Sequence, residues 1–304
     1  LTNRSRGNVI ADIEYSAVSS HGYVKTISES ETFRAGEKKQ KTISLPIDFK
    51  DTYELNVNVC IEETGENYSK SFPFSYIEKI NYSEDNIFGV CTHFSQDKGD
   101  VKTVAKLMKD AGVKWIRDEC GWGAVEKQRK VFAIPEKYMN YVDEMVANDI
   151  EVLMILDYGN RLYDEGGAPY TDEGIAAFAD YARFMAESFK GKIHTYELWN
   201  EYTTGMGNPK KQPPEVYAKM LDAVYKALRE VDPEIKLLCG GFLHPSNPAF
   251  KRIFDNGGFD KCDAISYHPY CMPQNPDTMD THGDSESNVF FSNELRRRYG
   301  QEKP

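Results

Sequence analysis

The first 80 residues alternate apolar and polar positions with a period of two. The alternation is clearest over residues 9–15, 41–45 and 53–59, and no helical repeat interrupts it. A period of two is typical of strands that bury one face. Turn sequences containing glycine separate the segments, so we count five to six short strands. The pattern predicts a small, immunoglobulin-like β-sandwich over residues 1–82, as an accessory domain.

From about residue 85 the pattern changes to strands that alternate with helices. Strand candidates begin near six positions: Ile87, Val113, Ile150, Ile193, Ile235 and Cys262. Helical segments between them cover residues 100–111, 135–148, 171–189 and 213–231. Asp100 and Thr171 are predicted N-caps, and glycine or proline follows the helix ends. Alternating β and α units predict a parallel sheet covered by helices.

Polar and aromatic side chains follow nearly every predicted strand, and they decide between two parallel-sheet folds. They are His93, Arg117, Asp157 with Tyr158, Asn200 with Glu201, and His268 with Tyr270. Groups spread over many strand ends favour a TIM barrel, because a doubly wound sheet gathers them at one switch point. No Gly-x-Gly-x-x-Gly follows a strand. The sequence therefore predicts an α/β domain of (β/α)8 TIM-barrel type over residues 83–304.

This predicted barrel is incomplete at its C-terminal side. The strand starts span residues 87 to 262, which gives about 35 residues for each unit. About six of eight units are then present, and two more would need about 70 residues, in keeping with a usual barrel of ~250 residues. A loop over residues 272–288 and a helical segment over 289–299 follow the sixth strand. We therefore expect a seventh strand to begin after Pro304.

Composition narrows the range of partners. Of 304 residues, 40% are hydrophobic and 28% are charged, as is typical of a globular protein. The net charge of −11 argues against binding to nucleic acid or to anionic membranes. No run of 18 apolar residues is present, so no membrane span is predicted. The six cysteines lack a Cys-x-x-Cys spacing, so they indicate no metal site.

Residues 196–201, Tyr-Glu-Leu-Trp-Asn-Glu, are the most informative stretch. Leu198 and Trp199 end a predicted strand, and Asn200 and Glu201 follow side by side. A carboxyl group at the exit of a barrel strand lies where barrel enzymes carry out chemistry. Cleavage of a glycosidic bond needs such an acid, with a raised pKa, to protonate the leaving oxygen. An ordinary surface Glu at a strand edge is the alternative.

Trp199-Asn200-Glu201 resembles the strand-4 signature of the clan A retaining glycoside hydrolases, and families 39 and 5 are the most similar. The resemblance implies a TIM barrel that needs no metal or organic cofactor. It also implies that Glu201 is the general acid/base and that Asn200 bonds the sugar 2-hydroxyl. The implied reaction hydrolyses O-glycosidic bonds of β-linked oligo- or polysaccharides by a retaining double displacement.

Further positions match the site of this clan. The clan carries an Arg at the position of Arg117 that orients the nucleophile carboxylate, and a guanidinium keeps such a carboxylate ionised. It also carries a His and a Tyr at the positions of His268 and Tyr270, and the Tyr donates to the nucleophile. The alternatives are a surface ion pair for Arg117 and ordinary packing for His268 and Tyr270.

Two more side chains are candidates from their place in the chain. His93 ends the first strand of the barrel, as a sugar contact or a structural His. Trp122 lies between two glycines, so we expect an exposed loop and a platform for a sugar ring, with core packing as the alternative. Glu119 and Glu197 match no catalytic position, and we expect both to support the site.

The nucleophile of the clan is a Glu at the end of strand 7, so we expect it beyond residue 304. The 304-residue chain is then expected to be inactive, as the front part of a longer enzyme. The alternative is a non-catalytic carbohydrate-binding barrel, truncated or degenerate. An unrelated acyl hydrolase is disfavoured, because no Gly-x-Ser-x-Gly is present. No signal peptide is visible, but we expect an extracellular or cell-surface protein acting on carbohydrate.

Overall fold

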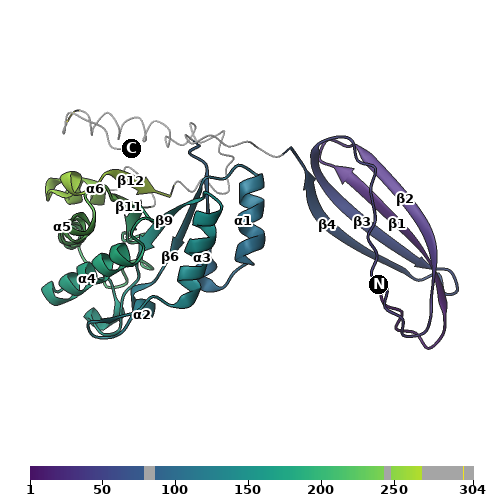
Figure 1. Ribbon diagram of the computed structural model, residues 1–304, viewed down its shortest axis with the longest axis horizontal. Helices are drawn as coiled ribbons and strands as arrows, with labels where there is room; N and C mark the ends of the chain where they lie inside the picture. The colour runs from purple at the N-terminus through teal and green to yellow at the C-terminus, as the bar shows by residue number, and fades with distance from the viewer. Residues whose placement is uncertain (79–85, 243–247, 269–296, 298–304) are drawn as a thin grey trace. The chain divides into compact units, whose positions relative to one another are not determined.

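The computed structural model describes residues 1–78, 86–242, 248–268 and 297 (Figure 1). The chain divides into two compact units, Leu1–Ile80 and Asn81–Pro304. The first unit is built from β-strands, and the second alternates strands with helices. This organisation confirms the predicted fold class, a partial TIM barrel preceded by an all-β region.

The N-terminal unit contains one antiparallel sheet with the strand order β2-β1-β3-β4. Its strands are β1 (Val9–Ser19), β2 (Val24–Phe33), β3 (Asp51–Ile61) and β4 (Asn67–Tyr76). Tight turns join β1 to β2 and β3 to β4. Gly22 and Gly65 adopt a left-handed backbone in these turns, with φ of 84° and 66°, which glycine reaches without a steric penalty.

One face of this sheet carries a small apolar core. Its buried members are Ala11, Ile13, Tyr15, Phe33 and Val59. These residues alternate along their strands with polar ones, so the period of two seen in the sequence reports this one-sided burial. Ile43 and Leu45, from the segment between β2 and β3, pack against the same core.

The prediction of a strand over residues 41–45 is wrong, because this segment pairs with none of the described strands. Side chains hold it to β2 instead. Lys39 Nζ lies 2.9 Å from Glu31 Oε1, and Lys41 forms an ion pair with Glu29. The second layer is therefore an irregular segment, and the described part of the sheet has four strands instead of the expected five to six.

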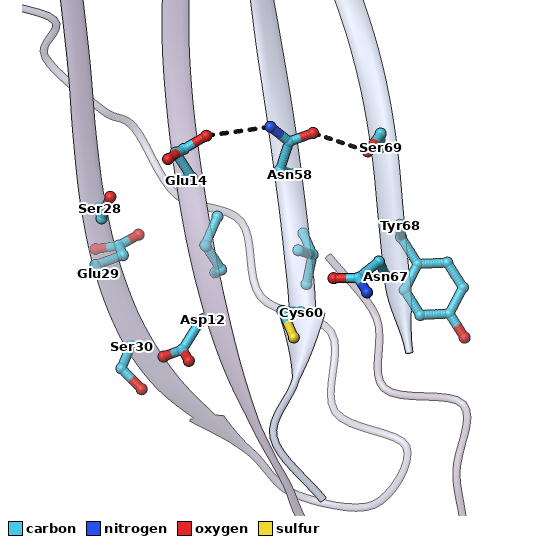
Figure 2. Close-up of a pocket in the computed structure, with 12 residues that line it drawn as sticks. Asp12, Glu14, Ser28, Glu29, Ser30, Asn58, Cys60, Asn67, Tyr68 and Ser69 are labelled. Carbon is cyan, nitrogen blue, oxygen red and sulfur yellow. Dashed lines mark hydrogen bonds between the residues drawn. The ribbon is translucent and has the colours of Figure 1, made fainter. Parts of the chain in front are cut away.

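The opposite face of the sheet is polar (Figure 2). Mainly polar side chains line an open hollow of about 590 Å³ on this face. Asn58 donates to Glu14 Oε1 at 3.2 Å and accepts from Ser69 Oγ at 2.8 Å, so hydrogen bonds cross β1, β3 and β4 (Figure 2). A face of this kind favours contact with water over burial against another sheet.

The second unit contains a six-stranded parallel sheet with the order β5-β6-β9-β10-β11-β12. Its strands are β5 (Gly89–Cys91), β6 (Trp115–Glu119), β9 (Glu151–Leu156), β10 (Thr195–Leu198), β11 (Lys236–Phe242) and β12 (Ala264–Tyr267). Each begins within two residues of its predicted start. A doubly wound sheet reverses its strand order at a switch point. This sheet runs in one direction, as a barrel does.

Helices follow the strands as predicted. The four predicted segments are α1 (Val101–Asp110), α3 (Glu136–Ala147), α4 (Asp172–Ser188) and α5 (Pro214–Val231), each correct to within one residue. Both predicted N-caps are present: Asp100 accepts from the Thr103 N–H at 2.9 Å, and Thr171 accepts from the Gly174 N–H at 3.0 Å. These bonds satisfy backbone donors that the first helical turn leaves free.

Shorter elements complete the described unit. They are α2 (Trp122–Val125), the hairpin β7 (Glu126–Gln128) and β8 (Val131–Phe132), α6 (Pro248–Asp255), and the 3₁₀ turns η1 (Phe94–Gln96), η2 (Asp164–Gly166) and η3 (Gly258–Lys261). One continuous apolar core joins the strands to the helices. None of the helices in the described ranges is long and apolar enough to cross a membrane.

Asp157, directly after β9, places a carboxyl group inside this core. The residue is 0% exposed, and neither side-chain oxygen has a hydrogen-bond partner among the described residues. Burial raises the pKa of Asp157 well above its ordinary value, and the neighbouring Glu119 raises it further. Asp157 is therefore favoured as the neutral acid, because an unpaired buried charge is far more costly than a buried polar group.

We expect replacement of Ile13 by Ala to destabilise the N-terminal unit by about 2–4 kcal/mol, because it leaves a cavity in a small core. Ile13 is 1% exposed. Its neighbour Glu14 lies on the polar face, so Glu14→Ala is the matched control and should cost less than about 1 kcal/mol. Calorimetric unfolding of both variants measures the difference. Equal losses would contradict a one-sided core.

The Asp157→Asn variant should be more stable than the parent at pH 7, with the advantage shrinking toward pH 4. An unfolded Asp loses its proton near pH ~3.9, whereas the raised pKa keeps it in the folded state. The contribution of Asp157 to the stability of the parent therefore falls as the pH rises above about 4. We expect a gain in Tm of roughly 2–8 °C at pH 7. The exposed Asp260→Asn is the control, and a pH-independent difference would show that Asp157 is ionised.

Candidate active site

The carboxyl ends of neighbouring parallel strands meet at one rim of the sheet, and this rim carries most of the predicted site. Arg117 lies in β6, Tyr158 follows β9, Asn200 and Glu201 follow β10, and His268 follows β12. Because β6, β9 and β10 are adjacent, their ends bring Arg117, Tyr158 and Asn200 within hydrogen-bond reach of one another.

A buried ion pair joins β6 to β10 at this rim. Arg117 Nε lies 2.7 Å from Glu197 Oε2, and Arg117 Nη2 lies 3.1 Å from Glu197 Oε1. Glu197 is 0% exposed and also accepts from Ser266 Oγ of β12 at 3.0 Å. Burial disfavours the charge on Arg117, but the bond to Glu197 outweighs it and raises the pKa of Arg117. The guanidinium therefore stays charged inside the rim.

Arg117 also fixes the carboxamide of Asn200. Arg117 Nη2 donates to Asn200 Oδ1 at 3.0 Å, and Asn200 Nδ2 donates to the Tyr158 hydroxyl at 2.9 Å. Since a guanidinium only donates, the amide atom that faces it must be the oxygen. The orientation of the Asn200 side chain is thereby determined from both ends.

Glu201 lies next to Asn200 and contacts His268. The distance between Glu201 Oε1 and His268 Nδ1 is 2.9 Å, and the two side chains are 18% and 17% exposed. An imidazole nitrogen can donate to a carboxylate or accept from a carboxylic acid. The contact can therefore persist whether or not Glu201 carries a proton.

The backbone around Glu201 is strained. Trp199 and Glu201 have φ of 64° and 53°, in the left-handed region that side-chain-bearing residues rarely adopt. Gly207 packs against this turn so closely that a Cβ there would lie 2.3 Å from the carbonyl oxygen of Glu201. Strain of this kind gathers at functional sites, where the surrounding structure holds it in place.

Two further predicted site residues are His93 and Tyr270. His93 is exposed and follows β5, whose residue Cys91 pairs with Arg117, so it lies at the same rim. His93 precedes η1, and its backbone carbonyl accepts from the N–H of Gln96, the last residue of that turn. Tyr270 lies outside the described residues.

Trp122 is the one candidate that the structure places elsewhere, and its expected role as a sugar platform is corrected. It is 0% exposed, with its indole stacked on Tyr163 at 5.1 Å between ring centroids and Phe178 packed edge-on. Its indole N–H donates to the buried Glu126 at 2.7 Å. This buried acceptor anchors the loop, and because the ring is fully buried, neither of its faces can stack on a sugar.

Two residues of the site were given no specific partner by the sequence. Glu197 was expected to support the site, and it does so as the main partner of Arg117. Tyr158 was noted as a strand-end residue without a role, and its hydroxyl bonds Asn200. A charged residue within an otherwise apolar strand was the available signal for Glu197. Within the described ranges, no group of three or more His, Cys, Asp or Glu is arranged to hold a metal ion.

Comparison with known proteins adds the family. The model of the cellulase family, glycosyl hydrolase family 5, matches residues 70–297. The chain is 27% identical over 143 residues to β-glucosidase 20 of Arabidopsis thaliana, covering 44% of this chain and 25% of that protein. It is 30% identical over 104 residues to β-glucosidase 30 of the same plant, covering 32% and 18%.

A solved structure shares the fold. The family 39 glycoside hydrolase from the gut symbiont Bacteroides cellulosilyticus WH2 matches with a TM-score of 0.71 and 23% identity, over 91% of this chain and 55% of that one. The chain thus spans about half of that structure and about a quarter or less of the two plant proteins. Because the family model covers most of its length, the chain belongs to the cellulase family, glycosyl hydrolase family 5.

Proposed function

We propose that this protein hydrolyses β-linked oligo- or polysaccharides with retention of configuration, and that Glu201 is its general acid/base. The observation that carries the proposal is the place of Glu201. It lies at the carboxyl rim of a partial barrel, between a fixed Asn200 and His268, whose Nδ1 is 2.9 Å away. Membership of a glycoside hydrolase family supports glycosidic bond cleavage in general.

In the first step Glu201 gives its proton to the glycosidic oxygen as that bond breaks, and a nucleophilic carboxylate bonds the anomeric carbon. In the second step the Glu201 carboxylate takes a proton from water, and the water oxygen displaces the nucleophile. Two displacements at one carbon restore its original configuration. The His268 contact suits this cycle because it can persist in both protonation states of Glu201.

The nucleophile is expected beyond residue 304, at the end of a seventh strand. The bonding of Arg117 supports this part of the proposal. Its Nε and Nη2 are engaged by Glu197 and Asn200, whereas no described residue accepts from Nη1. The two N–H groups of Nη1 could therefore hold one more carboxylate and keep it ionised. We propose the same orienting role for Arg117, and a donor role for Tyr270, toward that group.

The substrate is proposed from several partial arguments. The two matched plant proteins are named β-glucosidases, which supports a β-linked glycoside. Asn200 Nδ2 faces away from Arg117 and suits a contact with the sugar 2-hydroxyl, and exposed His93 suits another sugar hydroxyl. We propose an accessory role for the N-terminal domain and action outside the cell or at its surface. A non-catalytic carbohydrate-binding barrel remains the competing function, which the experiments below separate.

The first experiment compares two chain lengths. The 304-residue chain is expected to be inactive toward aryl β-glycosides, because we propose that the second carboxylate lies beyond residue 304. Protein made from the complete coding sequence should hydrolyse one of them, and NMR of the first-formed sugar should show a β-anomer. Full activity in the 304-residue chain would place the nucleophile within it, and inactivity of both proteins would favour the binding barrel.

The second experiment removes the acid. In the complete protein, Glu201→Gln should lower turnover of natural substrates by about 10²–10⁴-fold, since both steps need proton transfer. An aryl glycoside with a good leaving group should lose less in the first step. Azide should then restore turnover and give a β-glycosyl azide, because a small anion needs no general base. Glu187→Gln, on the exposed face of α4, is the matched control. An unchanged rate in Glu201→Gln would exclude the acid/base role.

A further inference from the structure

Tyr158 is a half-exposed residue at the centre of the rim whose role the proposed reaction leaves open. It follows Asp157 at the end of β9, and 39% of its surface is exposed. Its hydroxyl accepts a hydrogen bond from Asn200 Nδ2 at 2.9 Å. Asn200 directly precedes Glu201 in the chain, so the Tyr158 hydroxyl bonds the residue next to the proposed acid.

The ring of Tyr158 is held in place by packing. It lies edge-on to Trp199, with 6.1 Å between ring centroids and 79° between planes. Trp199 is itself buried, and its indole N–H donates to the Gly207 carbonyl at 2.8 Å. The position of the hydroxyl is therefore fixed relative to the strained turn that carries Asn200 and Glu201.

Hydrogen-bond polarity determines where the phenolic proton points. Because Arg117 donates to Asn200 Oδ1, the Asn200 amide group faces Tyr158 and donates to it. The Tyr158 oxygen then acts as an acceptor, and its own proton remains to be donated. None of the described residues accepts this proton, nor the second N–H of Asn200. Burial raises the pKa of Tyr158, so the phenol keeps its proton at neutral pH.

We propose that Tyr158 is a substrate-binding residue that donates its hydroxyl proton to the same sugar oxygen that Asn200 binds. The two donor atoms are 2.9 Å apart, so one oxygen with two lone pairs can accept from both. The inference rests on the proposed function, in which Asn200 binds the sugar 2-hydroxyl. It makes the site selective for glycosides that carry a free oxygen beside the anomeric carbon.

The test uses the complete protein and the aryl β-glycoside it cleaves fastest, with the 2-deoxy form of the same glycoside. Tyr158→Phe removes only the hydroxyl and keeps the ring against Trp199. We expect kcat/KM for the 2-hydroxy substrate to fall about 5- to 20-fold, as for loss of one hydrogen bond. For the 2-deoxy substrate we expect a change of less than about twofold, because the acceptor is absent.

Tyr68→Phe is the matched control, because Tyr68 is also exposed but lies in β4 of the N-terminal unit, where its hydroxyl bonds Glu66. Tyr68→Phe should leave kcat/KM for both substrates unchanged. An equal loss on both substrates in Tyr158→Phe, or no loss on either, would overturn the contact. Retained 2-deoxy activity shows that the variant is folded. If Glu201→Gln stops turnover while Tyr158→Phe changes nothing, only this inference fails. If the parent cleaves no glycoside, the proposed function itself fails.

Discussion

The ion pair between Arg117 and Glu197 is the interaction on which the candidate site depends. It joins β6 to β10 across β9, and the bond from Ser266 to Glu197 extends the connection to β12. A buried charge is tolerated only when it is paired and its remaining lone pairs are hydrogen-bonded. Glu197 meets this condition through three hydrogen bonds, from Nε and Nη2 of Arg117 and from Ser266 Oγ. The second N–H of Nη2 bonds Asn200, so the pair that stabilises the rim also orients the amide beside Glu201.

The turn after β10 holds Glu201 in position beside this ion pair. Its left-handed backbone at Trp199 and Glu201 is unfavourable by itself. Tight packing offsets that cost: the Trp199 indole is buried and hydrogen-bonded to Gly207, and Gly207 allows the chain to approach within contact of the Glu201 carbonyl. A larger residue at Gly207 would push the turn away. The contact of Glu201 with His268 therefore depends on the packing of Trp199 and Gly207.

Two buried carboxyl groups near this rim differ in how their burial is accommodated. Glu126 accepts from the Trp122 indole at 2.7 Å, the Tyr163 hydroxyl at 2.8 Å and the Lys130 N–H at 2.6 Å, so it anchors the loop after β6. Asp157 has no such partner in the described part of the chain, and burial raises its pKa. The first group is a structural hydrogen-bond centre. The second is a destabilising feature held in place by the packing around it.

The sequence by itself determined the elements and their order. Caps at Asp100 and Thr171, together with hydrophobic periodicity, located four helices to within one residue, and the Trp-Asn-Glu tripeptide placed Glu201 at a strand end. These signals are local in the sequence, so they can be read without knowledge of the fold. Which side chains and segments contact one another was decided only by the tertiary structure. Glu197 is 80 residues from Arg117, and the 41–45 segment has the alternation of a strand but no neighbour to pair with. The glycines beside Trp122 suggested exposure, yet a buried Glu126 holds the ring inside, because burial depends on contacts between distant segments that periodicity does not report.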